Sequence, residues 1–261
     1  MNALLRIENL CKYFSQHGET VLALDNISLS IQPGEIVGLA GESGSGKSTL
    51  ARCVAGLHSR DSGEMYFNDA LLPARFRAQD FARQAQNIQM IFQDPLSSLN
   101  PRLTIGDILM EPLRLSARAK QIRLSPQQQQ SLAQEWLIRM GLRASDMSRY
   151  PHSFSGGQLQ RIGIARALIN RPGLLICDEP ISALDVSVQA QIVNLLKDLR
   201  DEFGLALLFI GHDLAMMRYL CDRIAVMYRG AIVEQGATQD ILDHPQHGYT
   251  KKLVNSTPGI H

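Results

Sequence analysis

Short apolar runs, separated by segments with helical spacing, dominate the pattern of hydrophobic and polar positions along the chain. The runs are residues 36–40, 88–92, 174–177, 206–210 and 224–227. Uninterrupted apolar runs of this length are typical of strands buried on both faces of a parallel sheet. Between them, Leu50, Cys53, Val54 and Leu57 fall on one face of a helix. The alternation predicts an α/β fold with a parallel sheet.

Two stretches depart from this pattern. Near the N-terminus, Ile27, Leu29 and Ile31 alternate with serines, which predicts a half-exposed strand in a small antiparallel sheet. From residue 94 to about residue 149 the strand pattern disappears and helical spacing takes its place. One predicted helix there places Trp136 and Met140 on the same face and ends at Gly141. We therefore expect a helical subdomain inserted into the α/β core.

Composition and charge exclude several classes of protein. The chain has 261 residues, 45% of them hydrophobic, and its 26 basic residues balance 25 acidic ones. This near-neutral balance argues against a nucleic-acid partner. The four cysteines are widely spaced and form no CxxC pair, so the sequence predicts neither a disulfide framework nor a zinc site, and it fits a reducing cytosol. The longest apolar run falls far short of the roughly 20 residues of a membrane span.

The segment GESGSGKS, Gly41 to Ser48, fits the phosphate-binding pattern GxxxxGK[ST] and lies between a predicted strand and a predicted helix. Glycines let successive backbone N–H groups turn toward a phosphate, and the start of the helix adds its positive dipole end. Lys47 is expected to reach the β- and γ-phosphates, and the Ser48 hydroxyl is expected to ligate Mg²⁺.

Another predicted strand, residues 174–177, is followed directly by two carboxylates, Asp178 and Glu179. One carboxylate can hold Mg²⁺ while the other acts on water. In P-loop nucleoside triphosphatases the residue at the strand end is on the metal side, which assigns Asp178 to the metal and Glu179 to the attacking water. Taken alone, two acids after a strand also fit a solvated strand edge.

The segment SGGQ, Ser155 to Gln158, opens a largely apolar helix. A serine N-cap followed by glycines leaves N–H donors open to an anion. The alternative is that Ser155 only caps a buried helix and that the glycines permit tight packing. The order along the chain, with the phosphate loop first, SGGQ second and the acidic strand 23 residues after Ser155, favours the anion site.

With these three motifs in this order, the chain resembles the ATP-binding subunits of ATP-binding-cassette (ABC) transporters over nearly its whole length. The resemblance implies a P-loop NTPase (RecA-like) core with a parallel sheet, an N-terminal antiparallel β subdomain and an inserted helical subdomain. The implied domains are 1–93 with 169–240, then 94–168, and a C-terminal tail, 241–261. In that family two subunits face head to tail, and Ser155, Gly156, Gly157 and Gln158 would close over ATP held by the partner.

The resemblance also assigns further positions. Phe14 falls where the family places an aromatic ring under the adenine, although a core aromatic fits as well. Gln93 would touch Mg²⁺ or the lytic water, Asp185 lies in the loop that crosses the dimer interface, and His212 would contact the γ-phosphate. Gly211 departs from the Ser or Thr of many relatives. The implied nucleotide contacts in the phosphate loop are Gly41, Ser43, Gly44, Gly46, Lys47, Ser48 and Thr49, and the metal ligands are Ser48, Gln93 and Asp178.

Several segments narrow the resemblance. QDPLSSLNP (residues 93–101) followed by ILMEP is similar to importers of peptides, nickel and metallophores, and the segments around SGGQ and the acidic strand are similar to the second of their two ATPase subunits. HPQHGYT resembles their C-terminal segment. No cysteine follows Cys221, so we expect no iron–sulfur cluster.

The resemblance implies cofactors, partners and a location. The cofactors are ATP and Mg²⁺. The partners are a second, homologous ATPase subunit in a heterodimer, two integral-membrane permeases and an extracytoplasmic solute-binding protein, with no nucleic acid. The place is the cytoplasmic face of the inner membrane, as a peripheral subunit.

Three other classes share part of the pattern. An ABC exporter ATPase differs only in the segment after Gln93 and in the tail. A soluble ABC ATPase outside transport usually carries coiled coils or two cassettes, and the sequence shows neither. A P-loop kinase or GTPase has no use for SGGQ, and no NKxD motif occurs.

Overall fold

The computed structural model describes residues 2–16, 19–94, 98–120, 124–181 and 184–257. The chain forms two compact units. The first joins Met1–Asp80 to Gly204–His261, and the second is Phe81–Phe203. Helix α2 (Ala78–Gln84) runs through the boundary at residue 80. These units differ from the predicted division at residues 93 and 168, and that division stays a prediction.

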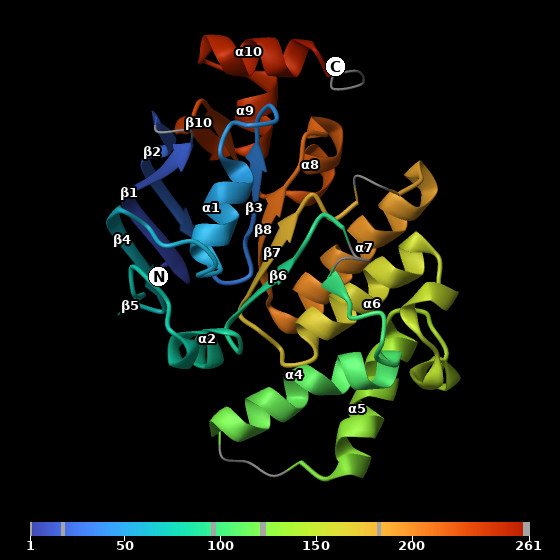
Figure 1. Ribbon diagram of the computed structural model, residues 1–261. Coiled ribbons are helices and arrows are strands. Elements are labelled where there is room, and N and C mark those ends of the chain that lie inside the picture. The colour runs from blue at the N-terminus through green and yellow to red at the C-terminus, as the bar shows by residue number, and fades with distance from the viewer. Residues whose placement is uncertain (1, 17–18, 95–97, 121–123, 182–183, 258–261) are drawn as a thin grey trace. The chain divides into compact units, whose positions relative to one another are not determined.

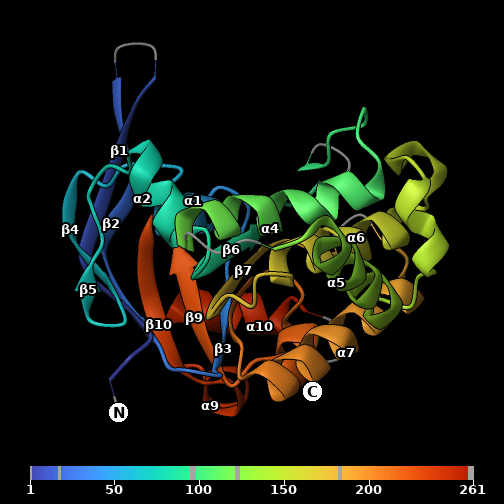
Figure 2. The same ribbon diagram turned by 90° about the horizontal axis from the view of Figure 1, so that it is seen from below.

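A four-stranded antiparallel sheet opens the first unit. Its order is β2 (Glu19–Ile31), β1 (Leu5–Gln16), β4 (Ser62–Phe67) and β5 (Ala70–Leu71). Figure 2 shows β1 and β2 as a long pair that extends beyond β4 and β5. Ile27, Leu29 and Ile31 are buried while the intervening residues are more exposed, as the alternation predicts. The N-terminal antiparallel sheet is thus confirmed.

The second sheet of this unit is mixed. β3 (Ile36–Ala40) lies between β8 (Ala206–Ile210) and β9 (Arg223–Tyr228) and is parallel to both, while β10 (Ala231–Ala237) adds to β9 in the antiparallel direction. Every residue of β3 and β8 is buried, as expected for strands covered on both faces. The helices of the unit are α1 (Lys47–Val54), α8 (Leu214–Leu220), α9 (Thr238–Asp243) and α10 (Gly248–Asn255).

The second unit combines a parallel strand pair with helices (Figure 1). β6 (Ile88–Ile91) pairs in parallel with β7 (Leu174–Asp178). Its helices are α4 (Ile105–Lys120), α5 (Pro126–Arg139), the 3-10 turns η1 (Ala144–Ser148) and η2 (Pro151–Ser153), α6 (Gly156–Leu168) and α7 (Val186–Phe203). α4 and α5 pack on each other and on α6. Trp136 and Met140 are buried, and Gly141 adopts a φ of 73° just past α5, so the predicted helix and its end are confirmed.

Within the described ranges, no helix is both long enough and apolar enough to cross a membrane.

Candidate functional site

The loop from Gly41 to Gly46 leaves the buried strand β3 and enters helix α1. Two of its glycines are required by their surroundings. Gly41 has a φ of 148°, and a Cβ there would lie 2.3 Å from the Met227 carbonyl oxygen. Gly46 has a φ of 106°, and a Cβ there would lie 2.6 Å from the Ala23 oxygen. Any side chain would displace this backbone, so the close approach to both neighbours depends on glycine.

Lys47 begins α1 and turns back over the loop. Lys47 is buried, with 5% of the residue exposed. Its Nζ donates hydrogen bonds of 2.8 Å to the carbonyl oxygens of both Gly41 and Glu42. The first turn of α1 contains no acidic residue that would offset the positive end of the helix dipole. Ser48 and Thr49 follow in the same turn and are half-buried, while Ser43 and Gly44 are exposed. Backbone donors, a dipole end and an ammonium group therefore converge on one loop, which suits a polyphosphate.

Phe14 lies on β1 and is half-exposed. Its ring meets the His58 ring edge to face at 5.3 Å, and the Lys12 ammonium lies 5.3 Å from the ring centroid. Lys12 is also paired with Asp61 at 3.1 Å. This polar, partly open setting disfavours the alternative of a simple core aromatic.

His212 follows β8 in the same unit and is exposed. β3 and β8 are parallel neighbours with Leu39 opposite Ile210, so the phosphate loop and His212 leave the sheet at the same edge. Ligands of open α/β sheets bind outside this edge, where the carboxyl ends of the strands lie. Asp213 caps α8 by accepting a 3.0 Å hydrogen bond from the Met216 N–H.

The second unit brings Gln93 and Glu179 together. Gln93 follows β6, Glu179 follows β7, and Gln93 Nε2 donates a 3.0 Å hydrogen bond to Glu179 Oε2. Glu179 has a φ of 47°, a left-handed backbone that is uncommon for a residue with a side chain and that tends to occur at functional sites. Asp178, the residue before it, is 5% exposed. The two neighbouring carboxylates thus differ in their surroundings. Asp178 is buried, and Glu179 accepts a hydrogen bond from the Gln93 side-chain amide.

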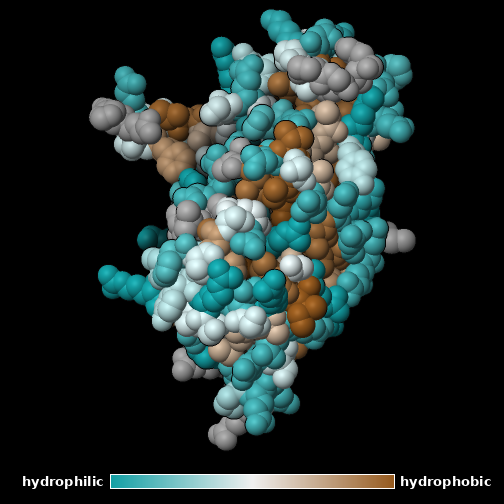
Figure 3. Space-filling view, turned by 90° about the vertical axis from the view of Figure 1, so that its right-hand side faces the viewer, coloured by the Kyte–Doolittle hydropathy of each residue, from teal (hydrophilic) through white to brown (hydrophobic). Residues whose placement is uncertain are grey.

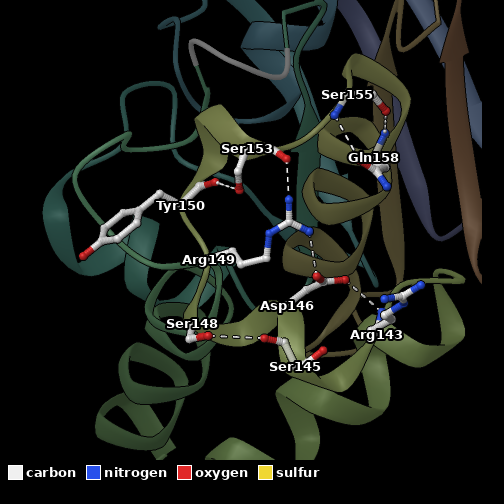
Figure 4. A network of polar contacts seen from close by, with 9 residues as sticks. All are labelled: Arg143, Ser145, Asp146, Ser148, Arg149, Tyr150, Ser153, Ser155 and Gln158. Carbon is white, nitrogen blue, oxygen red and sulfur yellow. Dashed lines mark hydrogen bonds and ion pairs between the residues drawn. The ribbon is translucent and has the colours of Figure 1, made fainter.

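Ser155 caps α6 through a capping box. Its Oγ accepts a hydrogen bond from the Gln158 N–H at 3.4 Å, and its own N–H donates to Gln158 Oε1 at 3.0 Å (Figure 4). At Gly157 a Cβ would lie 2.7 Å from Val188 Cγ1 of α7. The local contacts therefore match the capping and packing alternative, and the role of SGGQ toward a nucleotide stays a prediction.

A network that the sequence did not reveal supports the segment before Ser155 (Figure 4). Asp146 accepts hydrogen bonds from the Arg143 N–H at 3.0 Å and from Arg149 at 2.9 Å, and Arg149 donates at 2.6 Å to the carbonyl oxygen of Ser153. The Arg149 guanidinium also lies 4.3 Å from the centroid of the Phe154 ring. Asp146 is 6% exposed, so a buried carboxylate holds the segment that precedes SGGQ in place. Only its spacing of three from both arginines could have signalled the pairing.

A groove of about 660 Å³ lies in the second unit among α2, α4 and α6. Its lining mixes apolar and charged residues, including Phe81, Ala85, Glu111, Leu115 and Arg166. Leu115, one of its apolar lining residues, is 58% exposed. Apolar side chains also gather among hydrophilic ones on the face of the molecule that Figure 3 shows. No motif in the sequence marks this groove.

Two of the other predicted segments lie partly outside the residues that the structure describes. Residues 182–183 of the predicted interface loop and residues 95–97 after Gln93 are outside the described residues. Asp185 is exposed, and its carbonyl oxygen accepts hydrogen bonds from the N–H groups of Val188 and Gln189 in the first turn of α7. Among the residues that the structure describes, no group of three His, Cys, Asp or Glu side chains could hold a metal ion by itself.

A protein-family model described as "ABC transporter" matches residues 24–182 of the chain. The chain belongs to the ABC transporter family. The ABC cassette is 46% identical over 256 residues to a putative peptide import ATP-binding protein of Brucella ovis, covering 98% of this chain and 78% of the relative. It is 48% identical over 248 residues to the oligopeptide transport ATP-binding protein OppF of Salmonella typhimurium, covering 95% and 72%. For OppF of Bacillus subtilis the identity is 46% over 255 residues, covering 98% and 82%.

Solved structures agree with this placement of the ABC cassette. A dimeric, post-hydrolysis ATP-binding cassette bound to ADP and Pi matches with a TM-score of 0.81 and 30% identity, covering 90% of this chain and 98% of that one. CbiO1 of Clostridium perfringens, part of a cbiONQ transporter complex, matches with a TM-score of 0.79 and 25% identity, covering 94% and 92%. The predicted P-loop fold class, family and ATPase class are confirmed, and the ABC cassette uses a nucleotide.

Proposed function

We propose that this cassette is the ATP-hydrolysing subunit of a peptide importer. The observation that carries the proposal is the contact between Gln93 and Glu179, because it holds a carboxylate in position at the end of β7 in a chain of this family. A carboxylate in that position can take a proton from water as the water oxygen attacks the γ-phosphorus. The bond from the γ-phosphorus to the bridging oxygen then breaks, and ADP leaves.

The nucleotide would be bound by residues of the first unit. Phe14 offers a partly exposed ring for the adenine. The loop from Gly41 to Ser48 offers backbone N–H groups and the Lys47 ammonium to the phosphates. His212 would contact the γ-phosphate from the neighbouring strand end. The loop backbone fits a phosphate because glycine alone permits its close approaches at Gly41 and Gly46.

Mg²⁺ would be held by the Ser48 hydroxyl, the Gln93 amide oxygen and the Asp178 carboxylate. These are the hard oxygen donors that Mg²⁺ prefers, and waters and phosphate oxygens would complete its coordination. Only one of these three donors is a carboxylate, so the site does not need a cluster of acidic residues. The described residues contain no group of three His, Cys, Asp or Glu side chains that could hold a metal. When bound, the ion would neutralise charge that develops on the phosphates.

Hydrolysis would require two cassettes. Ser155, Gly156, Gly157 and Gln158 would face ATP held by a homologous, non-identical subunit, and Asp185 would lie at the interface between the two. One of the structural neighbours is dimeric and bound to ADP and Pi, which supports this arrangement.

The relatives support the proposed cargo, and the remaining partners are those that the family resemblance implies. One relative is named for peptide import and two for oligopeptide transport, which favours peptides over nickel or metallophores. Two membrane permeases would bind the pair of cassettes, and this cassette would contact them through the groove around Leu115. A solute-binding protein would deliver the peptide outside, and the cassette would lie on the cytoplasmic face of the membrane. An exporter ATPase and an ABC ATPase outside transport are disfavoured by the same names.

The proposal predicts the effect of Glu179→Gln in the assembled transporter. Because glutamine keeps a hydrogen-bond acceptor for Gln93 but cannot take a proton, ATP affinity should persist while steady-state hydrolysis falls by roughly 10²- to 10⁴-fold. The matched control is Glu202→Gln, at an exposed carboxylate paired with Arg139. A variant transporter that hydrolyses ATP at the wild-type rate would overturn the assignment of Glu179.

A further inference from the structure

The C-terminal helix α10 contacts the phosphate loop from the far end of the chain. The Tyr249 hydroxyl oxygen accepts a 2.9 Å hydrogen bond from the backbone N–H of Glu42, the second residue of the loop. The two residues are 207 positions apart and belong to the same compact unit. Figure 1 shows α10 beside the loop that joins β3 to α1.

The position of Tyr249 is set by contacts of its own. Its ring stacks on Tyr228 at the end of β9, with ring centroids 4.2 Å apart and planes 29° apart. The residues before α10 are held by Glu234 of β10, whose carboxylate accepts hydrogen bonds from the N–H groups of Gln246 at 2.7 Å and His247 at 3.0 Å. His247 Nδ1 in turn caps α10 by accepting the Tyr249 N–H at 3.2 Å. The hydroxyl is thus presented to the loop by a fixed support.

The hydrogen bond acts on one particular peptide group. The carbonyl of Gly41 and the N–H of Glu42 belong to the same planar trans peptide, so they point in opposite directions. Lys47 Nζ donates to that carbonyl at 2.8 Å, and Tyr249 accepts from that N–H at 2.9 Å. The peptide is therefore held at both ends, and a rotation that removed it from Tyr249 would also turn the carbonyl away from Lys47.

The same side of the loop meets the turn after β9. The Gly230 N–H donates a 3.0 Å hydrogen bond to the Ser45 carbonyl oxygen, and Gly41 packs against the Met227 carbonyl. Tyr228, which stacks on Tyr249, lies between these two contacts in sequence. Tyr249 therefore contacts both the loop and the turn that supports it.

We infer that Tyr249 is a positioning residue for the nucleotide site, which orients the Gly41–Glu42 peptide and through it the Lys47 ammonium. It does not touch the reacting atoms. A loop oriented before ATP arrives binds the phosphates without a further ordering cost, so losing the hydroxyl weakens binding in the ground state and the transition state alike.

The test compares Tyr249→Phe with Tyr228→Phe. Each variant removes one hydroxyl from the same ring stack, and only the first removes the acceptor for Glu42. Calorimetric titration of the full chain with ATP should give a dissociation constant about 2- to 10-fold higher for Tyr249→Phe, the range expected for one net hydrogen bond, and a near wild-type value for Tyr228→Phe. In the assembled transporter, KM for ATP should rise by the same factor while kcat changes little.

Three results would overturn the inference: an unchanged dissociation constant for Tyr249→Phe, an equal rise for Tyr228→Phe, or a fall in kcat and melting temperature with an unchanged KM, which marks a merely structural role. The inference rests on the assignment of residues 41–48 as the ATP site. Lys47→Ala separates the two ideas, because ATP binding that survives it removes the site assignment itself. Binding lost in Lys47→Ala but unchanged in Tyr249→Phe removes only the role of Tyr249.

Discussion

Asp146 shows how one carboxylate can organise a functional segment at a distance in sequence. Burial alone would raise its pKa, but the hydrogen bond from the Arg143 N–H and the Arg149 guanidinium outweigh it and hold the pKa below its usual value. The ionised form is thus favoured in the folded protein. Through Arg149 the charge also fixes the Ser153 carbonyl, two residues before the SGGQ segment.

This lowered pKa predicts a dependence of stability on pH. Because the folded pKa lies below the unfolded value of about 3.9, the carboxylate stabilises the fold fully above about pH 5, and the contribution is lost as the pH falls through the folded pKa. Asp146→Asn should therefore lower the free energy of unfolding by about 1–3 kcal/mol at pH 7, and by progressively less below about pH 4. Urea denaturation across this range measures the difference.

The control for Asp146 is Asp201→Asn, at a side chain 63% exposed in the same unit. This control substitution should change the free energy of unfolding little at any pH in this range. A difference between wild type and Asp146→Asn that stays constant from pH 7 to pH 3.5 would contradict the assigned role of the charge.

Residues inside a motif received a predicted role from the sequence, and residues outside one did not. Lys47 and Glu179 stand at fixed places in short patterns, and their roles toward a nucleotide stay predictions beside the local hydrogen bonds that the structure shows. Tyr249 and Asp146 act through a backbone N–H and a guanidinium that the chain brings to them only when folded. No local pattern marks such partners, because they are set by tertiary packing.

At the scale of elements, α5 and α6 begin in the same way. Ser125 and Gln128 form the capping box of α5, as Ser155 and Gln158 do for α6. The capping contacts of Ser155 therefore explain its place in the fold without explaining any role toward a nucleotide. The two helices offer a matched pair in which these roles can be separated.

We predict that Ser125→Ala and Ser155→Ala cost similar stability, about 1 kcal/mol each, because each removes one N-cap hydrogen bond. Only Ser155→Ala should lower ATP hydrolysis by the assembled transporter, by about tenfold or more, since it alone would lose a bond to a charged phosphate. Thermal melts and steady-state ATPase rates measure the two effects. Equal ATPase rates for the two variants would show that Ser155 only caps α6 and has no role toward the nucleotide. Gly157 is a poorer probe, because any side chain there meets Val188.

Apart from the alternating strand at Ile27, Leu29 and Ile31, the strands that the sequence predicted are those with a continuous apolar run. β3 and β8 were predicted with the bounds that the structure shows, and β6, β7 and β9 to within one residue at each end. β10 was missed because it lies at an antiparallel edge with no fully buried residue, so its sequence carries no continuous apolar run. Burial produces the hydrophobic pattern, and an exposed edge strand lacks it.

At the scale of the whole molecule, the groove around Leu115 predicts how the cassette joins its transporter. Gentle detergent extraction of a tagged chain, followed by intact-mass analysis, should recover two polytopic permeases and a second ATPase. Leu115→Asp should lose the permeases while keeping ATP binding, because a charge in an apolar contact must be desolvated. Ile138→Asp, at an exposed residue of α5 outside the lining, should keep them. Recovery of the wild-type chain alone, or only with itself, would contradict the proposed assembly.

The contact between Tyr249 and Glu42 also has a consequence during synthesis. A ribosome adds about 5–20 residues per second, so Tyr249 emerges roughly 10–40 s after Glu42, which lies 207 residues earlier. Until then the N–H of Glu42 lacks its partner in α10, even if β3 and α1 have already formed. The phosphate loop is therefore completed by a segment that is synthesised 207 residues later.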